Sequence, residues 1–309
     1  MSDPSLDARD DDLPIVDAHH HVWDPDANYI PWLCDEPPIP FRYGDYRSLR
    51  RPYMPDDFRR DWGRHRVVKS VYIETEWDPR DPIGETRWID AVARRHGLPH
   101  AVIAQAWLDR ADVAEVLAGQ AAFPIVRGIR HKPKASPRRE DARRGAPGSM
   151  DDPRWRDGYA LLARNGLHFE LQTPWWHLEA AAALARDFPA TMIVLNHTGL
   201  PSDRSAEGLA GWRAAMTTLA REPNVAVKIS GIGLPGRPWT PENNGPIIRD
   251  TIAIFGAARC MFASNFPVDG LAGSFDDIFS GFKRVTSDLP PETRRALFHD
   301  NAVRIYRLG

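Results

Sequence analysis

Residues 14–22 have the sequence PIVDAHHHV, an apolar run that ends in three histidines. An irregular stretch rich in proline and aromatic residues follows, from Trp23 to Pro52. Seven more short apolar runs follow along the chain. They lie at residues 67–74, 100–107, 125–131, 167–172, 191–197, 225–230 and 260–264. Because segments with helical spacing separate the runs, the pattern predicts βαβ units with a parallel sheet.

The number of these units decides between the two common parallel architectures. Helices are predicted at residues 55–62, 85–96, 112–120, 153–164, 178–187, 207–221, 246–255, 275–285 and 291–306. Eight strand–helix units in one chain favour a closed (β/α)8 TIM barrel over an open sheet. No GxGxxG follows the first run, which argues against a dinucleotide-binding domain. We therefore expect a single α/β barrel domain over residues 14–309, preceded by a disordered polar tail over residues 1–13.

Composition limits the classes of partner. The 309 residues carry a net charge of -2, which gives no general reason to bind nucleic acid or an anionic membrane. No apolar run approaches the roughly 18 residues that a membrane span needs. With only two cysteines and no basic, apolar leader, the sequence favours a cytoplasmic protein. We expect a small-molecule substrate, and assembly into homo-oligomers stays open.

The histidines of the first run are the strongest chemical signal. Side chains two residues apart on a strand point to the same side, so His19 and His21 should project together and His20 should point away. Two imidazoles at the carboxyl end of a barrel strand form half of a first-row metal site. The alternative is a set of surface or core histidines without chemistry.

Two later segments end at the same face of the predicted barrel. His197 follows the sixth run and could be a third imidazole at the mouth, or could cap a loop. Asp269 follows the eighth run, which lies beside the first in a closed barrel. Asp269 is therefore a candidate general base, or a loop-capping residue.

Other strand ends supply candidate substrate contacts. Arg130 could clamp a carboxylate or form a surface salt bridge, and Glu74 could be a ligand, a base or half of a structural ion pair. Lys228 could reach the mouth from the seventh run. The candidate walls of the pocket are Trp23, Trp32 and Trp77.

Several of these segments together resemble the amidohydrolase superfamily. The motifs are IVDAHHHVWDP (15–25), VVKSVYIE (67–74), VRGIRH (126–131), LNHTGLP (195–201), NVAVKISG (224–231) and MFASNFPVD (261–269). They resemble most the lactonase-like branch, which includes 2-pyrone-4,6-dicarboxylate lactonase and sugar lactonases. The resemblance extends from Pro14 to Tyr306.

The resemblance implies a site in which His19, His21 and His197 hold one divalent metal, zinc or manganese, or contact the substrate directly. Metal-independent activity stays open, since the branch varies in this respect. A binuclear centre is not expected, because the fifth run ends HFELQ (168–172) without a terminal histidine. The branch commonly has an aspartate as general base just after strand eight. Here that position is Asn265, so either Asp269 supplies the carboxylate or Asn265 only positions groups around the substrate.

These observations together predict a hydrolase. It would open a small lactone or related ester that carries carboxylate or hydroxyl groups, by attack of activated water. Two alternatives stay open: a nonoxidative decarboxylase of the same superfamily, and a catalytically inactive barrel that binds a ligand.

Overall fold

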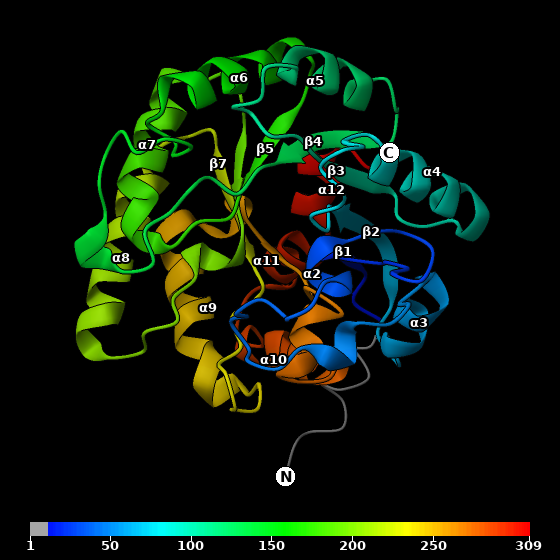
Figure 1. Ribbon diagram of the computed structural model, residues 1–309. Helices are drawn as coiled ribbons and strands as arrows, with labels where there is room; N and C mark the ends of the chain where they lie inside the picture. Colours follow the sequence, from blue (N-terminus) through cyan, green and yellow to red (C-terminus); the bar gives the residue numbers. More distant parts are fainter. Residues whose placement is uncertain (1–11) are drawn as a thin grey trace.

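The protein is an eight-stranded parallel barrel surrounded by helices (Figure 1). The computed structural model describes residues 12–309. The strands are β1 (Ile15–His20), β2 (Val67–Ile73), β3 (Ala101–Gln105), β4 (Val126–Arg130), β5 (His168–Leu171), β6 (Ile193–Leu195), β7 (Val225–Ile229) and β8 (Cys260–Phe262). Each pairs in parallel with the next in sequence order. The predicted α/β class and TIM barrel are confirmed.

The first and last strands meet through the segment that follows β8. The backbone N–H of Asn265 donates to the carbonyl of His19, and that of His21 donates to the carbonyl of Phe266, both at 2.7 Å. These two bonds bring the histidine segment and the strand-eight loop together at the barrel mouth.

The helices form the outer layer (Figure 1). They are α2 (Pro31–Cys34), α3 (Pro55–Asp61), α4 (Gly84–His96), α5 (Val113–Ala121), α6 (Pro153–Arg164), α7 (Leu178–Asp187), α8 (Ala206–Ala220), α9 (Pro241–Phe255), α10 (Phe275–Val285), α11 (Pro291–Arg295) and α12 (Asn301–Tyr306). The helix predicted from residue 246 begins at Pro241 instead. The Thr240 side chain accepts a hydrogen bond from the N–H of Asn243 and so caps the start of the helix. Pro246 therefore lies inside the helix.

Two apolar layers stabilise the barrel: one between the strands and the helices, and one inside the strands. Side chains that point inward, among them Val16, Val71 and Ile103, form an inner cluster. The C-terminal residues Ile305 and Tyr306 belong to the same cluster and close the end of the barrel where the strands begin. The carboxyl ends of the strands are therefore left as the end at which a ligand can enter.

Most of the predicted tail, residues 1–11, lies outside the described residues. Of the last two tail positions, Asp12 accepts a bond from Arg66 through its carbonyl, and Leu13 packs against the core. Within residues 12–309, every helix is too short or too polar to cross a membrane.

Candidate active site

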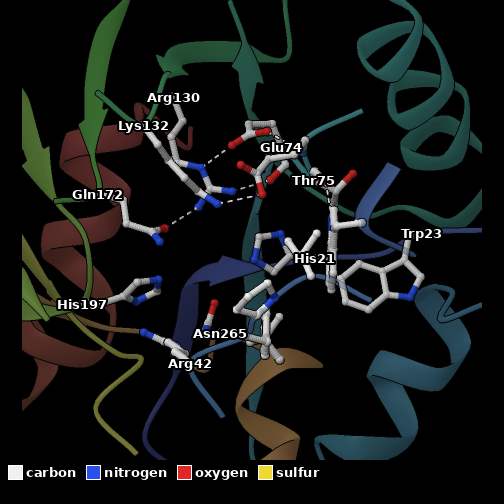
Figure 2. A pocket seen from close by; sticks show the side chains of 16 residues that line it. His21, Trp23, Arg42, Glu74, Thr75, Arg130, Lys132, Gln172, His197 and Asn265 are labelled. Atoms are coloured by element: carbon white, nitrogen blue, oxygen red, sulfur yellow. Dashed lines mark hydrogen bonds and ion pairs between the residues drawn. The ribbon is translucent and has the colours of Figure 1, made fainter. Parts of the chain in front are cut away.

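A cavity of about 320 Å³ opens at the carboxyl ends of the strands (Figure 2). Its walls come from the ends of β1, β2, β4, β5 and β6, from the loop after β8, and from the stretch between β1 and α3. The residues that line it are His21, Trp23, Trp32, Ile39, Pro40, Phe41, Arg42, Glu74, Thr75, Glu76, Arg130, Lys132, Gln172, His197, Asn265 and Val268. The cavity therefore lies where barrel enzymes bind their substrates.

His19 and His21 face the cavity side and His20 faces away, as their two-residue spacing predicts, but the inward direction of His19 depends on an irregular pairing of β1. Val16 and Ala18 already point inward, so simple alternation would turn His19 outward. The register between β1 and β2 shifts between Asp17 and His20, which restores the inward direction at His19. His20 lies outside the barrel wall and stacks on Phe58 with ring centres 4.1 Å apart.

His19, His21 and His197 form a cluster of imidazoles. The ring centre of His19 lies 5.1 Å from that of His21 and 4.6 Å from that of His197. The Nδ1 of His21 lies 2.8 Å from the carbonyl oxygen of Ile73. Because a carbonyl only accepts, Nδ1 carries the hydrogen and Nε2 keeps its lone pair. The Nδ1 of His197 lies 2.9 Å from Ser230 Oγ, and neither ring nitrogen of His19 has a hydrogen-bond partner.

The cluster is electrically neutral at ordinary pH. Burial lowers the pKa of His19, His21 and His197 well below the usual histidine value, and the nearby cations lower it further. For His19 the largest of these cationic effects comes from Lys228, and for His21 it comes from Arg130. Neutral imidazoles have free lone pairs, so they can accept protons or bind a cation.

The donor chemistry of the cluster suits one divalent ion, and the hydrogen bond from His21 to Ile73 is the kind that orients metal-binding histidines. The ring nitrogens of the buried His19 have no hydrogen-bond partner, which also favours a role as a metal ligand. However, no three His, Cys, Asp or Glu side chains within the described chain converge as a preformed metal site.

Arg130 and Glu74 form an ion pair in the cavity wall (Figure 2). Their side chains are only 4% and 2% exposed. Arg130 donates through Nε to the Glu74 carboxylate and through Nη2 to the Glu74 carbonyl, at 2.6 Å for the latter. Its Nη1 lies 3.3 Å from the Oε1 of Gln172. Both predicted substrate contacts therefore line the cavity, but they are already bonded to each other.

Asp269, predicted as a base, does not line the cavity. Its side chain is buried behind Asn265, whose Nδ2 donates to Asp269 Oδ1 at 2.6 Å. The same oxygen accepts from the Tyr43 hydroxyl at 2.9 Å and from Arg42 Nη2 at 3.2 Å. Burial raises the pKa of Asp269, while Arg42 opposes this shift. Its position suits a residue that holds two groups of the cavity wall, Asn265 and Arg42, in place.

The aromatic walls are partly as predicted. Trp23 and Trp32 line the cavity, whereas Trp77 lines a neighbouring one of about 320 Å³ that shares Trp32. Sequence reasoning missed Arg42 and Phe41 of the irregular stretch 23–52. Nothing in their spacing indicates that this stretch folds back over the mouth.

Lys228 lies inside the barrel and does not line the cavity. Its Nζ lies 2.9 Å from Glu170 Oε2, and both side chains are fully buried. The Tyr306 hydroxyl donates to the other oxygen of Glu170 at 2.7 Å. Lys228 therefore acts on the histidines above it through its charge.

Backbone strain is concentrated at the mouth. Six non-glycine residues of the described chain have a left-handed φ, and five of them follow β2, β6 or β8: Glu76, His197, Thr198, Leu200 and Asn265. Such conformations cost about 1–3 kcal/mol each, and they typically cluster at functional sites.

Comparison with known proteins agrees with this geometry. The family model described as Amidohydrolase matches residues 16–308. An uncharacterized protein of Sinorhizobium fredii, y4mH, is 42% identical over 297 residues, covering 96% of this chain and 99% of the relative. An L-fucono-1,5-lactonase of Burkholderia ambifaria is 29% identical, covering 95% of each chain. A crystal structure of a Burkholderia multivorans amidohydrolase with bound zinc is 26% identical, with a TM-score of 0.77, over 96% of this chain and 99% of that one. The protein belongs to the amidohydrolase family and is a hydrolase.

Proposed function

We propose that the protein hydrolyses a small lactone that carries hydroxyl or carboxylate groups. Water adds to the lactone carbonyl, the ring C–O bond breaks, and the product is an open-chain hydroxy acid. The observation that carries this proposal is the neutral imidazole cluster beside a cavity that Arg42, Arg130 and Lys132 also line. The L-fucono-1,5-lactonase name of a full-length relative supports the lactone class.

Each group in the cavity has a proposed role. His21 accepts the proton of the attacking water, because its Nε2 lone pair is fixed by the bond from Nδ1 to Ile73. The resulting His21 imidazolium gives this proton to the departing ring oxygen, directly or through His197, so that both imidazoles end neutral. Arg42, which lines the cavity, stabilises the negative charge that develops on the carbonyl oxygen. Asp269 is a positioning residue for Arg42 and Asn265.

We propose further that His19, His21 and His197 would hold one divalent ion as an alternative to this direct role of His21, because a lone pair that binds an ion cannot also accept a proton. The bound zinc of the Burkholderia multivorans structure supports this. When bound, such an ion would polarise the carbonyl or make water more acidic. A second ion is not proposed, since β5 ends in Leu171 and no histidine follows it directly.

Turnover of a panel of sugar lactones, followed as released acid, tests the proposal. The expected result is hydrolysis of at least one aldonolactone without CO2 release. Release of CO2 from hydroxybenzoates instead would establish the decarboxylase alternative. Binding of lactones without turnover, with or without added zinc or manganese, would indicate the inactive barrel. Elemental analysis of protein purified without added metal should find at most one ion per chain.

A further inference from the structure

A second cavity of about 170 Å³ adjoins the first. Arg42 lines both cavities, so it forms part of the wall between them. Apart from Arg42 and its neighbour Tyr43, the second cavity is built from the loops after β5, β6 and β7, with apolar walls that include Trp176 and Leu200. Arg204 lines it as well.

Gly231 places this cavity directly beside the imidazole cluster. The glycine lines the second cavity and has a left-handed φ of 59°. A Cβ at this position would lie 2.4 Å from His197 Nδ1 and 2.9 Å from Arg42 Nη2. The absence of a side chain therefore allows His197, Arg42 and the second cavity to lie next to one another.

Arg204 has unused hydrogen-bond donors in this cavity. Its Nη2 donates to the carbonyl of Ile232 at 2.8 Å. Its Nε and Nη1 are buried and have no partner. Burial lowers the pKa of Arg204 to about 10, and the neighbouring Tyr43 opposes this shift. The guanidinium therefore remains charged at neutral pH.

The three cations that line the main cavity each have a carboxylate partner, whereas Arg204 of the second cavity has none among the described residues. Arg42 is paired with Asp269, Arg130 with Glu74, and Lys132 with Glu76. Among the described residues, no carboxylate lies within 4 Å of the Arg204 guanidinium. A largely buried cation without a counter-ion is costly, and an anionic ligand would remove that cost.

We propose that the second cavity is a carboxylate subsite and that Arg204 determines specificity for lactones with a carboxylate on a ring substituent. The apolar walls fit the short carbon chain that would carry this group. The inference rests on the proposed lactonase activity, since it names the substrate class of the same site. It differs from the earlier expectation for Arg130, whose Nε and Nη2 are bonded to Glu74.

The test compares a matched pair of substrates in the wild-type protein and the Arg204→Met variant. The pair is an aldaric acid monolactone and the aldonolactone of the same configuration, which has CH2OH in place of the carboxylate. The substitution should raise KM for the aldaric monolactone about 30-fold or more, as expected for loss of a buried contact to an anion. It should change kcat/KM for the aldonolactone less than twofold. Arg237→Met, at an exposed arginine of the β7–α9 loop, should change neither.

A binding measurement separates failure of the subsite from failure of the proposed activity. Calorimetry should show that the open-chain aldarate binds the wild-type protein and binds Arg204→Met at least tenfold more weakly. This result would support the subsite even if no lactone were turned over. Equal effects of the substitution on both lactones, no aldarate binding, or tighter Arg204-dependent binding of inorganic phosphate would overturn it. Thermal unfolding serves as the folding control, because loss of an unpartnered cation should not lower Tm.

Discussion

Asn265 donates a hydrogen bond of 2.6 Å to Asp269, and this bond places the amide between the carboxylate and the cavity. The carboxylate also holds Tyr43 and Arg42. The position at which the sequence resemblance led us to expect a base is thus occupied here by a neutral group that a buried carboxylate orients.

Asp269→Asn should lower kcat/KM about tenfold and leave the shape of its pH profile unchanged. The amide keeps an oxygen for Tyr43 but removes the charge that pairs with Arg42. Steady-state kinetics from pH 5 to 9 measure this. A fall of about 10²–10⁴ in kcat with loss of the acidic limb would instead identify Asp269 as the general base.

Asn265→Asp should reduce activity more at pH 8 than at pH 6. Two carboxylates at hydrogen-bond distance raise one pKa, so they share a proton at the lower pH and repel each other at the higher pH. The measurement is the ratio of kcat/KM at pH 8 to kcat/KM at pH 6, which should be lower in the variant than in the wild type. An increase in hydrolysis across the whole range would show that a carboxylate at residue 265 restores a missing base.

Arg130→Met should destabilise the fold by about 3–5 kcal/mol, because it leaves the buried Glu74 carboxylate without its partner. The double variant Glu74→Gln with Arg130→Met should recover part of that loss. Urea unfolding of both variants and of the exposed-site control Arg237→Met measures the difference. If Arg130→Met folds normally and weakens only carboxylate-bearing substrates, Arg130 is a substrate clamp and not a structural cation.

His20→Phe should keep full activity, whereas His21→Asn should lower kcat by about 10²–10⁴. His20 stacks on Phe58 outside the barrel, and its two ring nitrogens have no partners. A phenyl ring preserves the stacking and removes those buried polar atoms, so stability should stay equal or rise by about 1 kcal/mol. Loss of activity in a folded His20→Phe variant would place His20 in the catalytic machinery.

Glu170→Gln should destabilise the protein by about 3–5 kcal/mol at pH 7, because Lys228 would be left as an unpaired buried cation. The second substitution Lys228→Met should restore part of the loss. Lys228 and hydrogen bonds hold the pKa of Glu170 at about 2 against the opposing effect of burial. The stabilisation by Glu170 is therefore complete above its unfolded pKa of about 4.3 and is lost as pH falls toward 2. Equal acid sensitivity of the wild type and the double variant would contradict this.

Local sequence determined the elements of the fold. The apolar runs of five to nine residues have the length of strands in a sheet covered on both faces, and the helical segments between them favour parallel pairing. Eight such units close as a barrel, and His19, His21 and His197 lie at strand ends in the sequence itself. The number of units and the approximate place of the imidazole cluster could therefore be predicted without a structure.

Only the tertiary structure shows which charged side chains are free to bind a substrate and which are already paired with one another. Glu74 and Arg130 are 56 residues apart, and only the packing of the ends of β2 and β4, with β3 between them, shows that they are bonded to each other. The position of Asn265 in front of Asp269, and of Arg42 above the mouth, depends on loops whose sequences have no periodic pattern. The shift of register in β1 is equally invisible, since it depends on the pairing with β2. Sequence spacing is local, whereas the pairing and burial of a charge depend on residues far away in the chain. For this reason the sequence located the site, and the fold determined which of its side chains remain free to bind a substrate.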